Sequence, residues 1–183
     1  MAGVAALVAA GKARAWGVVN WPAGLCGQAV EAAEGLAIAP PCAVQLPYSL
    51  VQRSWVEDTA MKQAVTRAGA GVVASFCLAG GALTGKYRSA AAAGRLAGTL
   101  TEPRFAPAIA AAGELAGLAE SLHTTAAALA LAFPFTNPDV ASVLFGATSV
   151  DQLRANCAAA ALWDRLGPDD IAALLRIGLP AGT

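Results

Sequence analysis

Residues 72–87 have the sequence VVASFCLAGGALTGKY, a short apolar run that passes directly into a glycine-rich turn next to a lysine. A short apolar run bounded by turn residues is typical of a buried strand in a parallel sheet. In parallel α/β folds, ligands bind on the loops that follow the carboxyl ends of the strands. The stretch therefore predicts a strand over residues 72–76 and a candidate binding loop directly after it.

Three other blocks have the same design, an apolar run followed by a polar or glycine-containing turn. They are GKARAWGVVNW at residues 11–21, VQLPYSLVQR at residues 44–53 and VLFGATSVDQLRAN at residues 143–156. Alanine-rich helical stretches separate the runs, and this alternation is typical of βαβ units with a parallel sheet. We expect four strands, at residues 13–19, 43–46, 72–76 and 140–145.

Recognisable start signals precede several of the expected helices. Pro22 suits the first turn of a helix that extends to about residue 36. Ser54, with Glu57 three residues later, predicts a capping box for a helix through residue 68. Ser149 is expected to cap a helix to about residue 162. Further helices are expected at residues 1–10, 108–122, 125–133 and 169–177.

The length and charge of the chain limit its class. A chain of 183 residues can form one domain with a real core, but a complete (β/α)₈ barrel typically needs about 250 residues. We therefore expect one partial domain over residues 1–183. The net charge of zero gives no electrostatic reason to expect nucleic acid or a membrane surface as a partner. The uncharged stretches 68–85 and 121–138 contain glycines or Pro134, which favour a buried strand with its loop and a core helix over membrane spans.

The cysteines give no sign of a metal centre. Cys26, Cys42, Cys77 and Cys157 are widely spaced and form no CxxC pair, and His123 is the single histidine. We expect no metal ligands, and we expect reduced thiols packed as small apolar side chains, which is typical of a cytoplasmic protein.

In this order, the four blocks resemble the C-terminal half of an aldo-keto reductase, most of all the branch that includes the voltage-gated potassium channel β-subunits. The resemblance covers residues 3–165. It implies an α/β fold that is half of a (β/α)₈ TIM barrel, with about four parallel strands and their helices, in a truncated chain that begins in the middle of that fold. It also implies an oxidoreductase that uses NADP(H).

The fourth block offers a place for a phosphate. Gly146 allows close backbone approach, and Thr148 and Ser149 put hydroxyl groups at a helix start, where free N–H groups favour an anion. Gln152 and Asn156 are expected on the same helix face as Ser149. The resemblance implies that this region holds the adenosine end and the 2′-phosphate of NADP(H). The alternative is simple helix capping by Ser149, with Gln152 and Asn156 solvated.

The third block offers a second anion site. The backbone N–H groups of Leu78, Ala79 and Gly80 could cradle a pyrophosphate, and Lys86 and Arg95 could add positive charge. The resemblance implies that this loop closes over the pyrophosphate of the cofactor. The alternative is that Lys86 and Arg95 only make the surface polar.

Asn20 and Gln45 are amides at the ends of the first two expected strands. An amide side chain can both donate to and accept from a carboxamide. The resemblance implies that these two residues hold the carboxamide of the nicotinamide. The alternative is that they satisfy backbone groups of the barrel.

The chain also departs from the family pattern. The family usually has a serine at Val19, and a glutamate near the adenine where this chain has Ala155. It usually ends the third strand with an aromatic residue, serine and proline, where this chain has Ser75, Phe76 and Cys77. The aromatic residue normally stacks on the nicotinamide. Strand alternation predicts that Phe76 faces away from that position unless a bulge turns it back.

We assign no catalytic residue. The resemblance implies hydride transfer from NADPH to a carbonyl, with a proton from a tyrosine that is supported by a lysine, an aspartate and a histidine. These four precede the matched region, and Tyr48 and Tyr87 lack such a setting. His123 is expected to be a capping or surface residue.

Three interpretations stay open. The chain could be a cofactor-binding half that needs a missing N-terminal half. It could be a non-catalytic, nucleotide-binding half-barrel in which two copies pair to make eight strands. It could also be a regulatory subunit, by analogy with the channel β-subunits.

Overall fold

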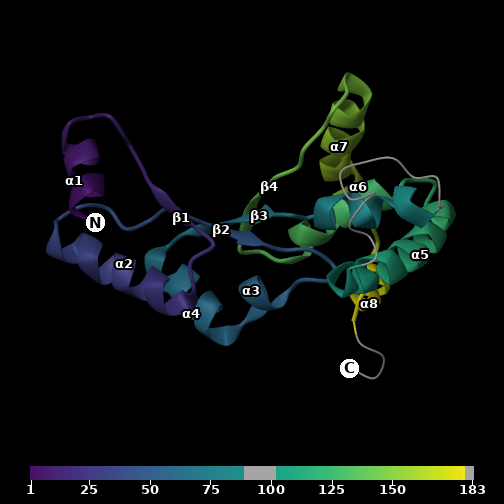
Figure 1. Ribbon diagram of the computed structural model, residues 1–183, viewed down its shortest axis with the longest axis horizontal. Coiled ribbons are helices and arrows are strands. Elements are labelled where there is room, and N and C mark those ends of the chain that lie inside the picture. The colour runs from purple at the N-terminus through teal and green to yellow at the C-terminus, as the bar shows by residue number, and fades with distance from the viewer. Residues whose placement is uncertain (89–101, 180–183) are drawn as a thin grey trace.

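The computed structural model describes residues 1–88 and 102–179 (Figure 1). Its centre is a sheet of four strands in the order β1-β2-β3-β4, in which all neighbouring strands are parallel. The strands are β1 (Gly17–Val19), β2 (Ala43–Pro47), β3 (Gly71–Ser75) and β4 (Val140–Val143). A sheet that keeps the order of the chain, with helices between its strands, is an arc of a (β/α)₈ barrel. The expected fold class is therefore confirmed.

The two sides of the sheet have different surroundings. Val18, Val44, Leu46, Val72 and Ala74 point to one side, and each is at most 6% exposed. They share a core with side chains of α2 (Ala23–Gly35), α4 (Thr59–Ala68), α5 (Ala106–Ser121) and α6 (Ala126–Ala132). The alternate residues turn to the opposite side, which we call the open face; its members are Gly17, Val19, Ala43, Gln45, Val73 and Ser75, and all are half-buried or exposed.

A bulge changes the register between β3 and β4. Val72 pairs with Val140 but Val73 pairs with Ser142, so Ala141 is the extra residue. Gly71 lies against this bulge, and a Cβ atom at position 71 would come within 2.6 Å of the Ala141 Cβ. A residue larger than glycine would therefore push the two strands apart.

The helix expected from Ser54 to residue 68 is broken, and the predicted capping box is wrong. The structure has a short helix, α3 (Ser54–Glu57), and then α4. Asp58 adopts ψ 136° between them and accepts hydrogen bonds from the N–H groups of Ala60 at 2.9 Å and Met61 at 3.2 Å. Aspartate competes for backbone N–H groups in this way, so it ends one helix and caps the next.

The other helices agree with the sequence to within a few residues. They include α1 (Ala2–Ala9), α7 (Val150–Trp163) and α8 (Pro168–Arg176), and the expected cap Ser149 of α7 forms. Thr125 also caps α6, which was not predicted from the sequence. Two strands are shorter than predicted: β1 begins at Gly17 and β4 ends at Val143. In Figure 1, α1 and α7 stand out from the rest of the molecule, and α1 has no buried residue.

The candidate binding loop after β3 and the chain that leads from it to α5 contain short 3₁₀ helices. These are η1 (Ala79–Thr84), η2 (Lys86–Arg88) and η3 (Pro103–Phe105), and a fourth, η4 (Phe133–Thr136), follows α6. Leu83 and Phe105 are buried and belong to the same core as Leu115 of α5. The segment therefore packs on α5 at both of its described ends.

Arg53 attaches the last helix to the carboxyl end of β2. Its Nε donates to the Leu50 carbonyl oxygen at 3.0 Å, and its Nη2 donates to the carbonyl oxygens of Leu175 at 2.9 Å and Ile177 at 2.8 Å. The guanidinium carbon lies 4.7 Å from the centre of the Phe133 ring. One side chain thus holds the carbonyl groups that α8 leaves unpaired at its end.

Within residues 1–88 and 102–179, no single helix has the length and hydropathy needed to cross a membrane. One pair of segments, Pro103–Ser121 and Ala126–Thr136, meets that test together by length and composition only, with a bend of 100° between them.

Candidate functional site

The carboxyl ends of the first three strands lie together at one end of the sheet, which we call the carboxyl edge. The N–H of Asn20, the first residue after β1, donates to the Gln45 carbonyl oxygen of β2 at 2.9 Å. The N–H of Tyr48, just after β2, donates to the Ser75 carbonyl oxygen at 2.9 Å. The structure therefore places Asn20, Gln45 and Ser75 together on the carboxyl edge, with Gln45 and Ser75 on the open face.

Two residues at this edge have left-handed backbone conformations. Asn20 and Phe76 directly follow β1 and β3, and both have φ of 57°. Asparagine adopts this region readily, but it is rare for a bulky residue. Because Phe76 is outside the extended strand, alternation no longer sets the direction of its side chain. The ring is 50% exposed at the carboxyl edge. The bulge in β4 lies opposite Val72 and Val73, so it is not the cause of the conformation at Phe76.

The turn after β3 is tightly wound. Ala79, Gly80 and Gly81 have φ of 49°, 68° and 99°. The N–H of Ala79 already donates to the Phe76 carbonyl oxygen at 2.8 Å, and the N–H of Gly81 donates to Leu78 at 2.8 Å. The turn therefore uses the Ala79 N–H, one of the three expected to face a pyrophosphate, for its own closure.

Lys86 is exposed beside this turn. Its Nζ lies 4.8 Å from the centre of the Tyr87 ring, and its Cε would lie 3.4 Å from a Cβ atom at Gly81. The ammonium group is therefore near the glycine turn, as a phosphate contact would require. Arg95 lies outside the described residues.

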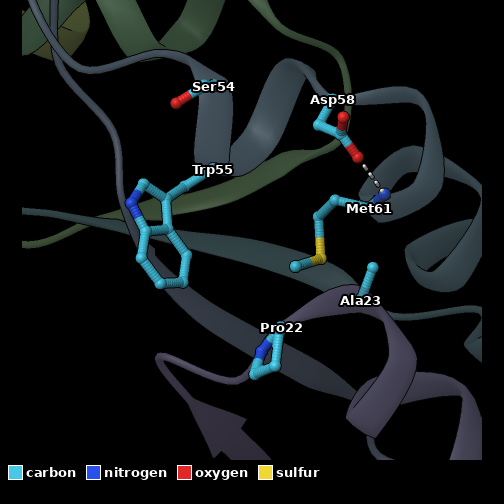
Figure 2. Close-up of a pocket in the computed structure, with 6 residues that line it drawn as sticks. All are labelled: Pro22, Ala23, Ser54, Trp55, Asp58 and Met61. Carbon is cyan, nitrogen blue, oxygen red and sulfur yellow. Dashed lines mark hydrogen bonds between the residues drawn. The ribbon is translucent and has the colours of Figure 1, made fainter.

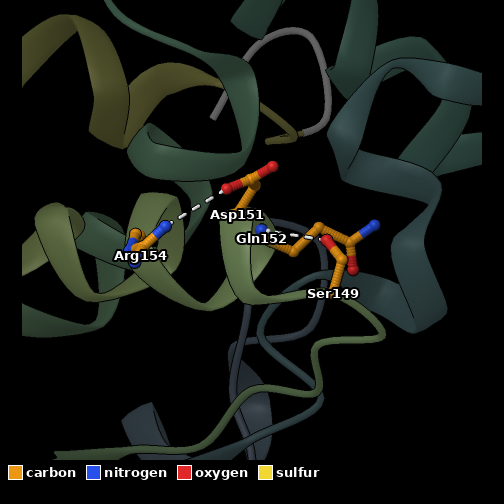
Figure 3. Close-up of polar contacts among 4 residues, drawn as sticks. All are labelled: Ser149, Asp151, Gln152 and Arg154. Carbon is orange, nitrogen blue, oxygen red and sulfur yellow. Dashed lines mark hydrogen bonds and ion pairs between the residues drawn. The ribbon is translucent and has the colours of Figure 1, made fainter.

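The start of α7 forms a compact polar cluster (Figure 3). The Ser149 Oγ accepts from the Gln152 N–H at 3.2 Å, and the Gln152 Oε1 accepts from the N–H and the hydroxyl of Thr148 at 2.9 and 3.0 Å. All three residues are exposed, as is Gly146. The Gln152 Oε1 is thus occupied, while its amide nitrogen is the group with hydrogens to donate.

Asn156 has different surroundings. It is half-buried and lines a cavity of about 310 Å³ between β4, α6 and α7, together with Ser142, Phe145 and Cys157. Asn156 therefore has a more buried environment than Ser149 and Gln152, although the spacing of the three residues keeps them along one side of α7.

A charged pair that was not predicted from the sequence lies at this helix start. Arg154 Nη1 lies 3.5 Å from Asp151 Oδ1, with the side chains 77% and 95% exposed (Figure 3). The i, i+3 spacing of opposite charges on a helix was visible in the sequence and could have identified the pair. An exposed ion pair is weak, so Arg154 can turn to another anion.

A second cavity opens between the starts of α2 and α4 (Figure 2). It has a volume of about 270 Å³ and is lined by Pro22, Ala23, Ser54, Trp55, Asp58 and Met61. Figure 2 shows the Met61 side chain extending toward Pro22 and Ala23, with the Trp55 ring at one side. Its walls come from the connections that follow β1 and β2, so it lies at the same end of the sheet.

Tyr48 is not arranged as a proton donor. Its side chain is 1% exposed, and its hydroxyl donates to the Glu57 Oε1 at 2.8 Å. Burial, followed by the hydrogen bond to the Glu57 carboxylate, raises the pKa of the Tyr48 phenol above its usual value. The phenol therefore holds its proton at neutral pH.

Comparison with known proteins fits this geometry. The family model described as "Aldo/keto reductase family" matches residues 1–178. A protein of Schizosaccharomyces pombe assigned as a voltage-gated potassium channel β subunit is 30% identical over 172 residues, which cover 89% of this chain and 49% of that protein. A corresponding Arabidopsis thaliana protein is 31% identical over 155 residues, 77% of this chain and 45% of its own length.

The protein Tas of Escherichia coli is 34% identical over 117 residues, 62% of this chain and 33% of Tas. The chain thus spans about half the length of the two channel-subunit relatives. With a family model that matches nearly every residue and a parallel sheet in barrel order, the chain belongs to the aldo/keto reductase family.

Proposed function

We propose that this chain binds NADP(H) along the carboxyl edge of its sheet and serves as the cofactor-binding part of an aldo-keto reductase. The observation that carries the proposal is the meeting of Asn20, Gln45 and Ser75 at one edge, through the hydrogen bonds that join the three strand ends. Carboxyl edges of parallel strands are where such folds bind their ligands.

The nicotinamide end would lie at Asn20 and Gln45. Gln45 is half-buried on the open face and its side chain has both a donor and an acceptor for a carboxamide. The exposed ring of Phe76 follows the neighbouring strand β3, and a flat apolar surface of this kind can stack on a planar ring.

The phosphate end would lie at the start of α7. This helix has 14 residues, and the positive end of its dipole is at Ser149 and Gln152. The amide nitrogen of Gln152 and the guanidinium of Arg154 supply donors for the 2′-phosphate that distinguishes NADP(H) from NAD(H). Lys86, beside the turn after β3, supplies charge for the pyrophosphate.

When bound, the cofactor supplies the hydride for carbonyl reduction. The residues of this chain bind and orient it. Tyr48 takes no part in proton transfer, because its phenol is buried and bonded to Glu57.

The first test is a titration of the protein with NADPH, in which the fluorescence of its four tryptophans is followed and NADH is the comparison. We expect saturable binding with a micromolar dissociation constant, about −8 kcal/mol, and weaker binding of NADH. A folded protein that shows no saturable change with either nucleotide would contradict the proposal.

Two glutamine variants locate the two ends of the cofactor. Gln45→Leu removes a carboxamide contact, so it should weaken NADPH and NADH alike, by about tenfold. Gln152→Leu removes a phosphate contact and should weaken NADPH alone. Gln28→Leu is the matched control, because Gln28 is exposed on α2, away from the carboxyl edge. Equal effects of all three variants would show that the site is elsewhere.

A further inference from the structure

The open face has the character of a barrel interior without its other wall. On the covered side, Val44, Leu46 and Val72 are at most 1% exposed, whereas Val19 on the open face is 53% exposed. No member of the open face is charged. A large uncharged sheet surface is normally covered by another part of a protein.

The two edges of the sheet are also unfinished. In the described part of the chain, β1 pairs only with β2, and β4 pairs only with β3. The Trp16 oxygen and the Asn20 N–H point to β2, so by alternation the backbone groups of Gly17 and Val19 point outward. Unpaired strand edges of this kind readily accept another strand.

Four exposed apolar side chains belong to the segments that adjoin the two edge strands. Leu7 of α1 is 49% exposed, Leu144 just after β4 is 42% exposed, and Val150 and Leu153 of α7 are 60% and 47% exposed. Helix α1 leads into the amino end of β1 and helix α7 follows the carboxyl end of β4, so each adjoins one of the two edge strands, at opposite ends of the sheet (Figure 1).

We propose that two copies of this chain associate about a twofold axis that coincides with the barrel axis and close an eight-stranded parallel barrel. Such an axis keeps all strands parallel and places β4 of each copy beside β1 of the other, in two identical contacts. Eight is the number of strands at which a closed barrel is just wide enough for side chains to fill it.

In the closed barrel, the open face of each copy is covered by the open face of the other. The open faces of the two copies form one interior, which buries no charge and so carries no large desolvation cost. Each junction pairs the free side of β4 in one copy with the free side of β1 in the other. The carboxyl edge of the closed barrel carries Asn20, Gln45 and Ser75 twice.

The test is the molar mass in solution, measured by size-exclusion chromatography with light scattering and without nucleotide. We expect one species with twice the 18.2 kDa mass of the chain. Val19→Lys puts a charge in the interior and Leu144→Lys puts one beside the β4 edge, so both should give a monomer at the same concentration. Leu36→Lys should stay dimeric, because Leu36 is 41% exposed at the end of α2, away from both edges.

Circular dichroism of each variant shows whether its helices are intact, and either lysine variant that keeps them suffices for the test. A folded wild-type monomer, a wild-type protein that forms only large aggregates, or a dimer that survives both Val19→Lys and Leu144→Lys would overturn the proposal. Dissociation by Leu36→Lys would also do so, since it places the interface on the helices. Cofactor binding enters none of these measurements, so this inference and the proposed function fail separately.

Discussion

Cys77 and Tyr48 are buried acids that keep their protons in the folded state. Burial raises the pKa of the Cys77 thiol from 9.0 to about 12, and it raises the pKa of the Tyr48 phenol as well. The unfolded chain releases these protons near the ordinary values, so the folded state binds more protons at alkaline pH. The stabilisation is complete below pH 9 and is lost as the pH rises toward 12.

We therefore expect the free energy of unfolding to fall above pH 9 by up to about 1.4 kcal/mol per pH unit for Cys77, with a further fall above pH 10 from Tyr48. Urea unfolding at a series of pH values measures this slope. Cys77→Ala should reduce the slope between pH 9 and 10, and Cys157→Ala, a substitution at an exposed cysteine, is the control. An unchanged slope in Cys77→Ala would show that the Cys77 thiol does not cause the loss of stability above pH 9.

Asp151 places a negative charge in the first turn of α7, where the proposed function places a phosphate, and it also holds Arg154 at 3.5 Å. Asp151→Asn should lower the dissociation constant of NADPH by about threefold and affect NADH much less. The gain should shrink as salt is added. Asp164→Asn, an exposed change at the other end of α7, is the control. Equal tightening of NADH would show that the phosphate is not the group involved.

Residue-level predictions succeeded where the interaction is local. Ser149 caps α7 as its sequence position indicates, and Thr148 and Gln152 gather around it within four residues of chain. Asn156 and Ala79 are different, because a neighbouring helix and a closed turn decide their surroundings. Sequence spacing describes neither of these.

At the scale of the element, helices were predictable and one break was not. Ser54 and Glu57 have the spacing of a capping box, but Asp58 offers a stronger cap to the helix that follows. Glu57 is then free to accept the Tyr48 hydroxyl, a contact between residues nine apart in the chain. Which residue caps the helix, Ser54 or Asp58, thus depends in part on tertiary contacts such as this one, and a local sequence pattern does not reveal them.

The attachment of α8 by Arg53 can be measured by substitution. Arg53→Met leaves the carbonyl oxygens of Leu50, Leu175 and Ile177 without this donor, so it should cost about 2–3 kcal/mol of unfolding free energy. Arg67→Met is the matched control, since Arg67 makes an exposed ion pair with Glu31 at 3.2 Å and should cost under about 1 kcal/mol. Similar losses in both variants, measured by urea unfolding, would show that the attachment adds no special stability.

For the whole molecule, the alternation of strands and helices was sufficient to predict the class of sheet and its four parallel strands. Each strand and its following helix form a local unit, so the pattern repeats along the sequence. The open face is a property of the assembled sheet. The open face depends on which side of the sheet the helices cover. In the sequence, its only sign is a low share of charged residues.

Association of two copies has a thermal consequence. Because the dimer binds only the folded state, a tenfold rise in protein concentration should add about 1.4 kcal/mol of stability per dimer and raise the melting temperature by a few degrees. Differential scanning calorimetry at two concentrations measures the shift. Val19→Lys should melt at one temperature regardless of concentration, and a wild-type protein that does the same would count against the barrel.

The contacts of Arg53 with Leu175 and Ile177 are made to peptide oxygens, so replacing the Leu175 side chain leaves its contact in place. Removing the peptide units does not. A carboxypeptidase that digests the chain through residue 175 deletes both oxygens and frees the guanidinium that lies over Phe133. Digestion to this point, followed by urea unfolding, should therefore show a loss of stability that side-chain substitutions at position 175 do not show.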